Sequence, residues 1–387
     1  MRRRAGLGLS LFLSACGGSG SQATVAPPQG DAGALDAAHD ASPFADIAVE
    51  TAVSPDAGAP PDDVGETLVA DAGPPGTAVT GPRNQWLWVD EPDARCANGR
   101  PTGFGLNLAD DQTRLVIFLQ GGGACWDAAS CNPVVPSSFY VATGYGRFEF
   151  NTDVLRPSML PLRRLDPSNP FRNMSMVYVP YCTGDVHAGD RVAEYNGRPF
   201  HHVGARNLGL FLRRVTATFP RVRRVWLMGD SAGGFGAALN MDRVQRVFPN
   251  ARVDVLDDSG QPIEPPAERW AQWRAAWNLQ LPEGCDPRCA SSIASITDLI
   301  RQRYPNNRFG LISYSHDAVI STFMGLNSLE FNRRLESFVT EMGRQWPSGR
   351  AFILPGLLHV GFLTPTPAML RWINAMITDD PSWQTVN

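Results

Sequence analysis

Six short runs of apolar and β-branched residues recur between residues 114 and 356, and each predicts a strand. They are Arg114–Gln120, Met174–Tyr181, Arg224–Gly229, Arg252–Asp258, Arg308–Ser315 and Arg350–Gly356. Their hydrophobicity is nearly continuous instead of alternating, which is typical of strands buried on both faces of a parallel sheet.

Segments with apolar residues at helical spacing alternate with these runs. They are His202–Phe219, Phe235–Phe248, Pro266–Gln280, Ala290–Tyr304, Ser328–Trp346 and Pro367–Ile377. The alternation predicts an α/β fold, a doubly wound and mostly parallel sheet flanked by helices in a single domain from about residue 83 to residue 387. Functional side chains are then expected just after the carboxyl ends of the strands.

The amino-terminal part of the chain has a different composition. Residues 1–15 run from arginines through an apolar stretch to small residues before Cys16, the pattern of a bacterial lipoprotein signal peptide that is cut so that Cys16 is lipidated. An ordinary signal peptide with an incidental cysteine is the alternative. Residues 17–82 hold ten acids and no arginine or lysine, so residues 16–82 are predicted to be a disordered acidic tether.

The charge of the remaining chain is close to neutral. The whole sequence has 34 basic and 38 acidic residues; without the three signal arginines and the ten tether acids, 31 and 28 remain. This excess is too small to indicate nucleic-acid binding, although it permits an acidic polymer as substrate. The sequence contains no lysine, which excludes Schiff-base and P-loop lysine chemistry. We expect no cofactor, no metal and a monomer.

Six cysteines remain besides Cys16, and an even number in an exported protein predicts disulfides. They are Cys96, Cys125, Cys131, Cys182, Cys285 and Cys289. Cys125 with Cys131 and Cys285 with Cys289 can each close a small loop, which leaves Cys96 for Cys182; this is a preference among fifteen possible pairings. A zinc site is the rival, disfavoured because the sequence has no Cys-x-x-Cys pair and no histidines at ligand spacing.

The pentapeptide Gly229-Asp-Ser-Ala-Gly233 comes directly after a predicted strand and opens a predicted helix. A strand that ends in Gly-x-Ser-x-Gly and enters a helix is the nucleophile elbow of the α/β-hydrolases. Small residues on both sides of Ser231 allow the sharp turn, and the helix N-terminus brings an N–H group to the place where an oxyanion forms. A purely structural turn is the alternative.

Two further candidates also follow predicted strands, as does a glycine-rich loop. The loop Gly121-Gly-Gly-Ala-Cys-Trp126 could bring backbone N–H groups to an oxyanion. Asp317 and His359 give the order Ser, Asp, His of the α/β-hydrolases, with His359 as the base that activates Ser231 and Asp317 as the group that orients it. His316 is the other downstream histidine, and Asp258, with Asp257 beside it, is the other candidate acid.

Together these motifs resemble the pectin acetylesterase/Notum family of serine carboxylesterases. The matching stretches are Cys96–Phe104, Leu119–Trp126, Val179–Val186, Gly229–Gly234 and Asp258–Gly260, with the late aspartate and histidine. The resemblance implies removal of O-acyl groups by a triad of Ser231, Asp317 and His359. It also implies an oxyanion hole of Gly122, Gly123 and Ala232, and it agrees with the preferred cysteine pairing. Departures at Ser315-His-Asp317 and after His359 leave the substrate less defined than the chemistry.

Tryptophans mark a possible pocket wall. Trp270, Trp273 and Trp277 form a helical stripe, for which core packing is one interpretation and a lid or sugar-stacking face is the other. Trp126, beside the glycine loop, is the better candidate for the wall of the substrate pocket.

The sequence therefore predicts a lipid-anchored esterase of the cell envelope that deacylates a polymer, first of all an acetylated polysaccharide such as pectin. A carboxylesterase or lipase for longer acyl chains, or a protein deacylase, is the second hypothesis. A binding lipoprotein on an inactive hydrolase fold is the third.

Overall fold

The computed structural model describes residues 68–69, 76–134, 137–155 and 157–387. These residues all belong to one compact unit. The predicted signal peptide and Cys16 lie outside the described residues. Among the helices within them, none is long and apolar enough to cross a membrane.

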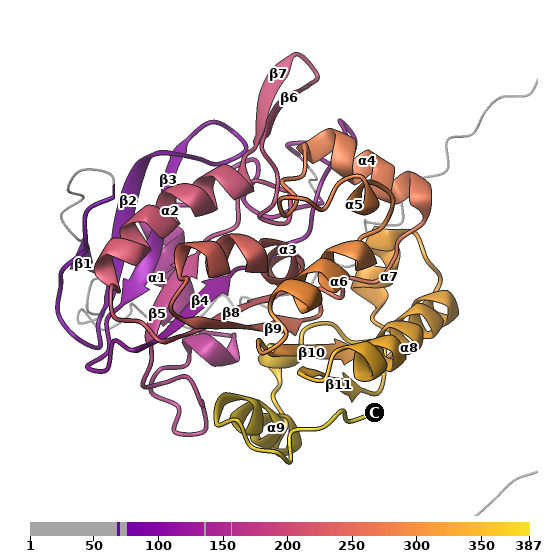
Figure 1. Cartoon of the computed structure of the whole chain (residues 1–387). Coiled ribbons are helices and arrows are strands. Elements are labelled where there is room, and N and C mark those ends of the chain that lie inside the picture. The colour runs from indigo at the N-terminus through magenta and orange to yellow at the C-terminus, as the bar shows by residue number, and fades with distance from the viewer. Residues whose placement is uncertain (1–67, 70–75, 135–136, 156) are drawn as a thin grey trace, which may run out of the picture. The chain divides into compact units, whose positions relative to one another are not determined.

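A nine-stranded sheet forms the centre of this unit (Figure 1). Its order is β1-β2-β3-β5-β4-β8-β9-β10-β11. The last six strands in this spatial order are mutually parallel. They are β4 (Arg114–Leu119), β5 (Ser175–Val179), β8 (Arg224–Asp230), β9 (Arg252–Asp258), β10 (Phe309–Tyr314) and β11 (Gly349–Leu354). The predicted fold class is confirmed, and these six strands are the six that the sequence indicates.

The sheet extends beyond the predicted strands at one edge. There β2 (Trp86–Arg95) pairs antiparallel with β3 (Pro101–Asn107), and β1 (Leu68–Val69) pairs with β2. The side chain of Val79 is buried, and its N–H donates to Oγ1 of Thr218 at 2.9 Å. Residues 68–69 and Val79 therefore belong to the folded unit, which begins before the tether boundary expected at residue 82.

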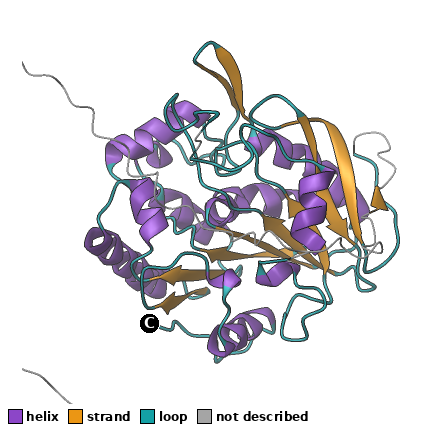
Figure 2. Cartoon of the chain, turned by 180° about the vertical axis from the view of Figure 1, so that it is seen from behind, coloured by secondary structure: helices purple, strands orange, loops and turns teal. Residues whose placement is uncertain are grey.

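Helices cover both faces of the sheet (Figure 2). One face packs against α2 (Gly204–Thr218), α3 (Ala232–Val247), α6 (Ala294–Arg303) and α8 (Ser328–Gln345). The other packs against α1 (Arg147–Leu155) and α9 (Pro367–Ile377). Successive residues of a strand enter opposite cores, as Leu227 and Met228 of β8 do, which is why these strands read as continuous apolar runs.

Shorter elements follow the carboxyl ends of several strands along the chain. They are the hairpin β6 (Arg191–Tyr195) and β7 (Arg198–His202), and the helices α4 (Ala267–Trp277), α5 (Arg288–Ser291) and α7 (Ala318–Met324), with a 3-10 turn at Gly361–Leu363. Of these, the sequence predicted α4, whereas the hairpin and α7 are additions.

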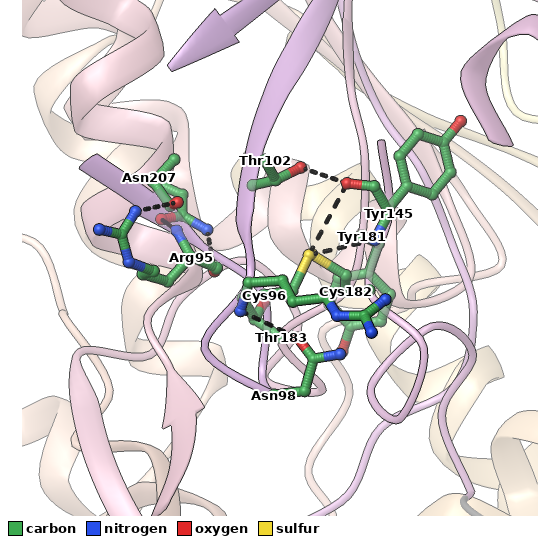
Figure 3. Close-up of a disulfide and its surroundings, with 12 residues drawn as sticks. Arg95, Cys96, Asn98, Thr102, Tyr145, Tyr181, Cys182, Thr183 and Asn207 are labelled. Carbon is green, nitrogen blue, oxygen red and sulfur yellow. Dashed lines mark hydrogen bonds between the residues drawn. A yellow bond between two sulfur atoms is a disulfide. The ribbon is translucent and has the colours of Figure 1, made fainter. Parts of the chain in front are cut away.

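The three preferred disulfides are present: Cys96–Cys182, Cys125–Cys131 and Cys285–Cys289. Figure 3 shows the first, which joins the turn between β2 and β3 to the loop after β5. Close beside the bridge, the N–H of Ala97 donates to the carbonyl of Cys182 at 2.8 Å, and the N–H of Tyr145 donates to Sγ of Cys96 at 3.3 Å. The bridge therefore fixes two loops to each other at the same end of the sheet.

Candidate active site

Ser231 occupies the junction between β8, which ends at Asp230, and α3, which begins at Ala232. Its φ of 52° and ψ of −121° lie in a region that non-glycine residues rarely adopt, which is typical of a strained nucleophile elbow. Two backbone hydrogen bonds hold the turn. The N–H of Ser231 donates to the carbonyl of Asp258 at 2.7 Å, and the N–H of Phe235 donates to the carbonyl of Ser231 at 3.1 Å.

Close backbone approach explains the two glycines of the pentapeptide. A Cβ at Gly229 would lie 2.3 Å from the carbonyl oxygen of Gly233, and a Cβ at Gly233 would lie 1.9 Å from that of Leu119. Both positions therefore exclude side chains, and the elbow can pack directly against the end of β4.

Asp317 and His359 meet beyond the ends of β10 and β11. Oδ2 of Asp317 lies 2.7 Å from Nδ1 of His359, while Oδ1 accepts the N–H groups of Val319 and Ile320 and so caps α7. Asp317 is fully buried. Burial lowers the pKa of His359, but the hydrogen bond and charge of Asp317, with the charges of Asp258 and Asp230, outweigh it and raise the pKa above 6.5.

The other two candidates for these roles have different partners. Nδ1 of His316 is hydrogen-bonded to Oγ of its neighbour Ser315 at 2.9 Å. The Asp258 carboxylate accepts the N–H groups of Gly361 and Phe362 at 2.9 and 2.6 Å, so it holds the loop that follows His359 instead of the imidazole. Burial raises the pKa of Asp258 to about 6.

Asp258 also brings Ser231 and His359 to one place, because its carbonyl binds the N–H of Ser231 while its carboxylate binds the loop after His359. Within the described part of the chain, no hydrogen bond joins Oγ of Ser231 to His359 itself. In free enzymes such bonds are often long and shorten when substrate binds.

The glycine loop lies beside the elbow. The N–H of Gly121 donates to Oδ1 of Asp230 at 3.1 Å, and burial raises the pKa of that carboxyl to about 7. Gly123 pairs with Ser138, and the two bonds that flank the pair use the N–H groups of Ala124 and Phe139. The N–H of Gly123 takes no part in these two bonds, as an oxyanion donor requires.

Gln120 holds the start of the glycine loop in place through hydrogen bonds. Its position in the sequence directly before the glycines did not reveal this role. Its amide donates to Asp153 and accepts the N–H of Tyr181, each at 3.0 Å. Burial lowers the pKa of His187 to about 4, so its neutral ring can donate from Nε2 to the Gln120 carbonyl at 2.8 Å. Asp153 and His187 reach Gln120 only through the tertiary fold, so sequence spacing gave no signal for them.

An apolar pocket opens at Ser231. It is lined by Gly123, Ala124, Val186, Ser231, Ala232, Phe235, Leu239, Trp270, Trp273, Trp277, Leu279, Ile293, Ile320 and Phe323. The three tryptophans of α4 are buried in the core, as the first interpretation of the stripe expected, and they also line the pocket. The free space is about 20 Å³, little more than the ~10–15 Å³ that one water needs.

Trp126 does not line this pocket, contrary to the expectation. Its ring packs against Trp273 and Phe323, with centroids 5.9 and 6.2 Å away, and the guanidinium of Arg269 lies 4.4 Å above it. Trp126 instead faces a second hollow on the other side of α4. The side chains of Trp273 and Phe323, which line the pocket, lie against Trp126, and its position in sequence beside the glycine loop did not indicate this packing.

One group of potential metal ligands, Cys125, Cys131 and His202, lies within the described residues. The two cysteines are bonded to each other, so they offer no thiolate. The nitrogens of His202 are hydrogen-bonded to the Thr183 carbonyl and the Tyr195 hydroxyl. This donor set does not fit a metal.

Comparison with known proteins identifies relatives of this chain. The Notum palmitoleoyl-protein carboxylesterase of Schmidtea mediterranea is 28% identical over 158 residues, which are 40% of this chain and 29% of that protein. The human enzyme of the same name is 30% identical over 175 residues, 43% of this chain and 34% of that protein. The chain thus spans about a third of the length of these relatives.

The structure of the Wnt deacylase Notum from Drosophila has the same fold. Its TM-score is 0.53 at 21% identity, and the alignment covers 70% of this chain and 86% of that one. The model of the Pectinacetylesterase family matches residues 76–275, which include Ser231 and end before Asp317. The match covers more than half of the sequence, and the chain belongs to the pectinacetylesterase family.

Proposed function

We propose that this chain is a carboxylic ester hydrolase in which Ser231 is the nucleophile, His359 the general base and Asp317 the residue that orients His359. The observation that carries the proposal is the 2.7 Å contact between Oδ2 of Asp317 and Nδ1 of His359, at the site where Ser231 stands on its strained turn. Family membership supports it.

The chemistry follows from these positions. Nε2 of His359 takes the proton of Ser231 as Oγ attacks the ester carbonyl carbon, and the oxyanion is stabilised by N–H groups of Gly122, Gly123 and Ala232. The intermediate collapses to an acyl-serine, and His359 protonates the departing alcohol. Water, deprotonated by His359, then attacks the acyl-serine and releases the carboxylic acid.

The pocket supports a short acyl group. Its walls are apolar, which suits the hydrocarbon part of an acyl chain, but its free space of about 20 Å³ accommodates little more than a methyl group without side-chain movement. We therefore propose O-acetyl esters of a polysaccharide as substrate. The apolar lining, together with the names of the Notum relatives, makes a longer acyl group on a lipid or a protein the second candidate.

The three disulfides support export, since such bonds persist outside the reducing cytosol. We extend the proposal to a lipoprotein that is anchored through Cys16 at the cell envelope.

A chain-length series of p-nitrophenyl esters tests the acyl preference. We expect the highest kcat/KM on acetate, with a decline by butyrate. If butyrate or a longer ester is hydrolysed fastest, the hypothesis of a hydrolase for longer acyl chains replaces that of a deacetylase. If no ester is hydrolysed, the result supports a non-enzymatic binding protein. Acetate release from acetylated xylan and acetylated pectin then compares the two polymer classes.

A further inference from the structure

A second hollow lies on the opposite side of α4 from the acyl pocket. Trp270, Trp273 and Trp277 face the pocket. The hollow is lined instead by Gln272, Ala275 and Ala276, which a rotation of about 100° per residue places on the opposite side of the helix. The hollow is open to solvent and has a volume of about 370 Å³, and residues of β6 form its far wall. Figure 1 shows the hairpin of β6 and β7 projecting beside α4.

Several polar groups of the hollow are available to a ligand. Among the described residues, none accepts from the indole N–H of Trp126, and none forms a hydrogen bond with the side chains of Glu194 or Gln272. All three residues line the hollow. An indole N–H, a carboxylate and an amide together offer both donors and acceptors, which suits a ligand with many hydroxyl groups.

The charges of the hollow disfavour an anionic ligand. Among the lining residues, Asp127 and Glu194 contribute two carboxylates and Arg191 contributes one guanidinium, which already donates to the carbonyl of Ala275. A second guanidinium, that of Arg269, lies 4.4 Å from the ring centre of Trp126 but does not line the hollow. A uronate chain would bring further carboxylates toward Asp127 and Glu194, and like charges repel each other. A neutral hydroxyl-rich chain meets no such repulsion.

Two aromatic side chains add apolar area. Tyr195 and Trp126 both line the hollow, and aromatic rings with a polar tip suit ligands that are apolar on one face and hydroxylated at the edge. Trp126 also packs against Trp273 and Phe323 of the acyl pocket. A ligand in the hollow therefore lies next to a residue that supports the pocket wall.

We propose that this hollow binds the main chain of a neutral glycan, the polymer whose ester groups are hydrolysed at Ser231. The identification of this glycan as the substrate rests on the proposed function, whereas binding itself does not. The proposal distinguishes the chain from a pectin-directed enzyme, because the main chain of pectin is a polyuronate.

Calorimetric titration with deacetylated oligosaccharides tests the binding directly. The probes are hexamers of xylose, mannose and glucose, with a galacturonate hexamer of equal length as the anionic comparison. We expect at least one neutral hexamer to bind at least about tenfold more tightly than galacturonate at low salt, a difference that high salt reduces.

The variant Glu194→Ala/Gln272→Ala removes two exposed polar groups from the hollow, and its dissociation constant should rise about tenfold. The matched control, Arg198→Ala/Glu268→Ala, changes exposed residues of the same hairpin and helix that do not line the hollow, and it should keep the affinity of the parent. Tighter binding of galacturonate, no binding of any neutral hexamer, or unchanged affinity in the first variant would overturn the proposal.

Hydrolysis of p-nitrophenyl acetate by the parent protein is measured separately. Its absence would refute the proposed function without affecting the binding result. Hydrolysis together with no glycan binding would refute this inference alone.

Discussion

The two carboxylate oxygens of Asp317 are divided between two tasks, and one of them joins Asp317 to His359. Oδ2 lies 2.7 Å from Nδ1 of His359, while Oδ1 accepts the N–H groups of Val319 and Ile320 in the first turn of α7. A single side chain thus orients the proposed base and begins the helix next to it.

This division predicts the effect of Asp317→Asn. The amide oxygen can still cap α7, because asparagine is as good a capping residue as aspartate, so the free energy of unfolding should change little. The amide cannot hold the imidazole in the required tautomer, and kcat should fall by about 10³- to 10⁴-fold. Ester hydrolysis and urea unfolding of the same preparation measure both effects. A variant that keeps a tenth of the parent's kcat would contradict the assignment.

Asp258→Asn should give the reverse pattern. Asp258 accepts the N–H groups of Gly361 and Phe362 with different oxygens, so its amide would place an NH₂ group against one of these donors. An unsatisfied buried group costs about 1–3 kcal/mol, which should appear in urea unfolding. We expect a smaller loss of kcat than in Asp317→Asn. Inactivation of Asp258→Asn below the level of Asp317→Asn would identify Asp258 as the triad acid.

The raised pKa of His359 predicts the acid limb of the pH profile. His359 must be neutral to accept the proton of Ser231, so kcat/KM should rise with pH through the pKa of the free enzyme. We expect the midpoint above pH 6.5, because Asp317, Asp258 and Asp230 outweigh the effect of burial. The profile of a soluble ester between about pH 5 and about pH 9 measures it. A midpoint below 6.5 would show that burial prevails.

The same shift has a consequence for stability. Because the pKa of His359 is raised on folding, its contribution to the free energy of unfolding is complete below pH 6.5 and is lost as pH rises through the folded pKa. Burial raises the pKa of Asp230 to about 7, so Asp230 titrates in the same pH range, and the variant Asp230→Asn separates its contribution to stability from that of His359.

The same variant, Asp230→Asn, removes a negative charge near His359. The acid limb of the kcat/KM profile should therefore move to lower pH.

The disulfides should differ in their contributions. Cys96–Cys182 closes a loop with a sequence separation of 86, and Cys125–Cys131 closes one of 6. Loop-closure entropy predicts losses of about 4.6 and about 2.2 kcal/mol when each pair is replaced by serines. Urea unfolding of the two double variants measures the order. A larger loss for Cys125→Ser/Cys131→Ser would show that local strain or packing outweighs the entropy of the unfolded chain.

The sequence predicted the parallel strands well, because a strand buried on both faces leaves a continuous apolar run such as Leu115–Leu119. The sheet edge formed by β2 and β3 gave no such signal, because β2 contains the acidic residues Asp90, Glu91 and Asp93. The order of Ser231, Asp317 and His359 could be read from the chain.

The sequence favoured Asp317 as the acid but left Asp258 as the other candidate, since both follow strands. Their distinction lies in bonds across the fold, where Asp258 meets Gly361 and Phe362 more than a hundred residues away. The side of α4 on which Trp126 lies depends on tertiary packing in the same way.

The most direct test of the central claim is the rate of p-nitrophenyl acetate hydrolysis by Ser231→Ala, compared with the parent and with Ser382→Ala. Ser382 is an exposed serine near the carboxyl terminus and serves as the matched control. Loss of the nucleophile should lower kcat by about 10⁶-fold, while the control keeps the parent's rate. Hydrolysis by Ser231→Ala as fast as by the parent would show that the ester is cleaved without this serine.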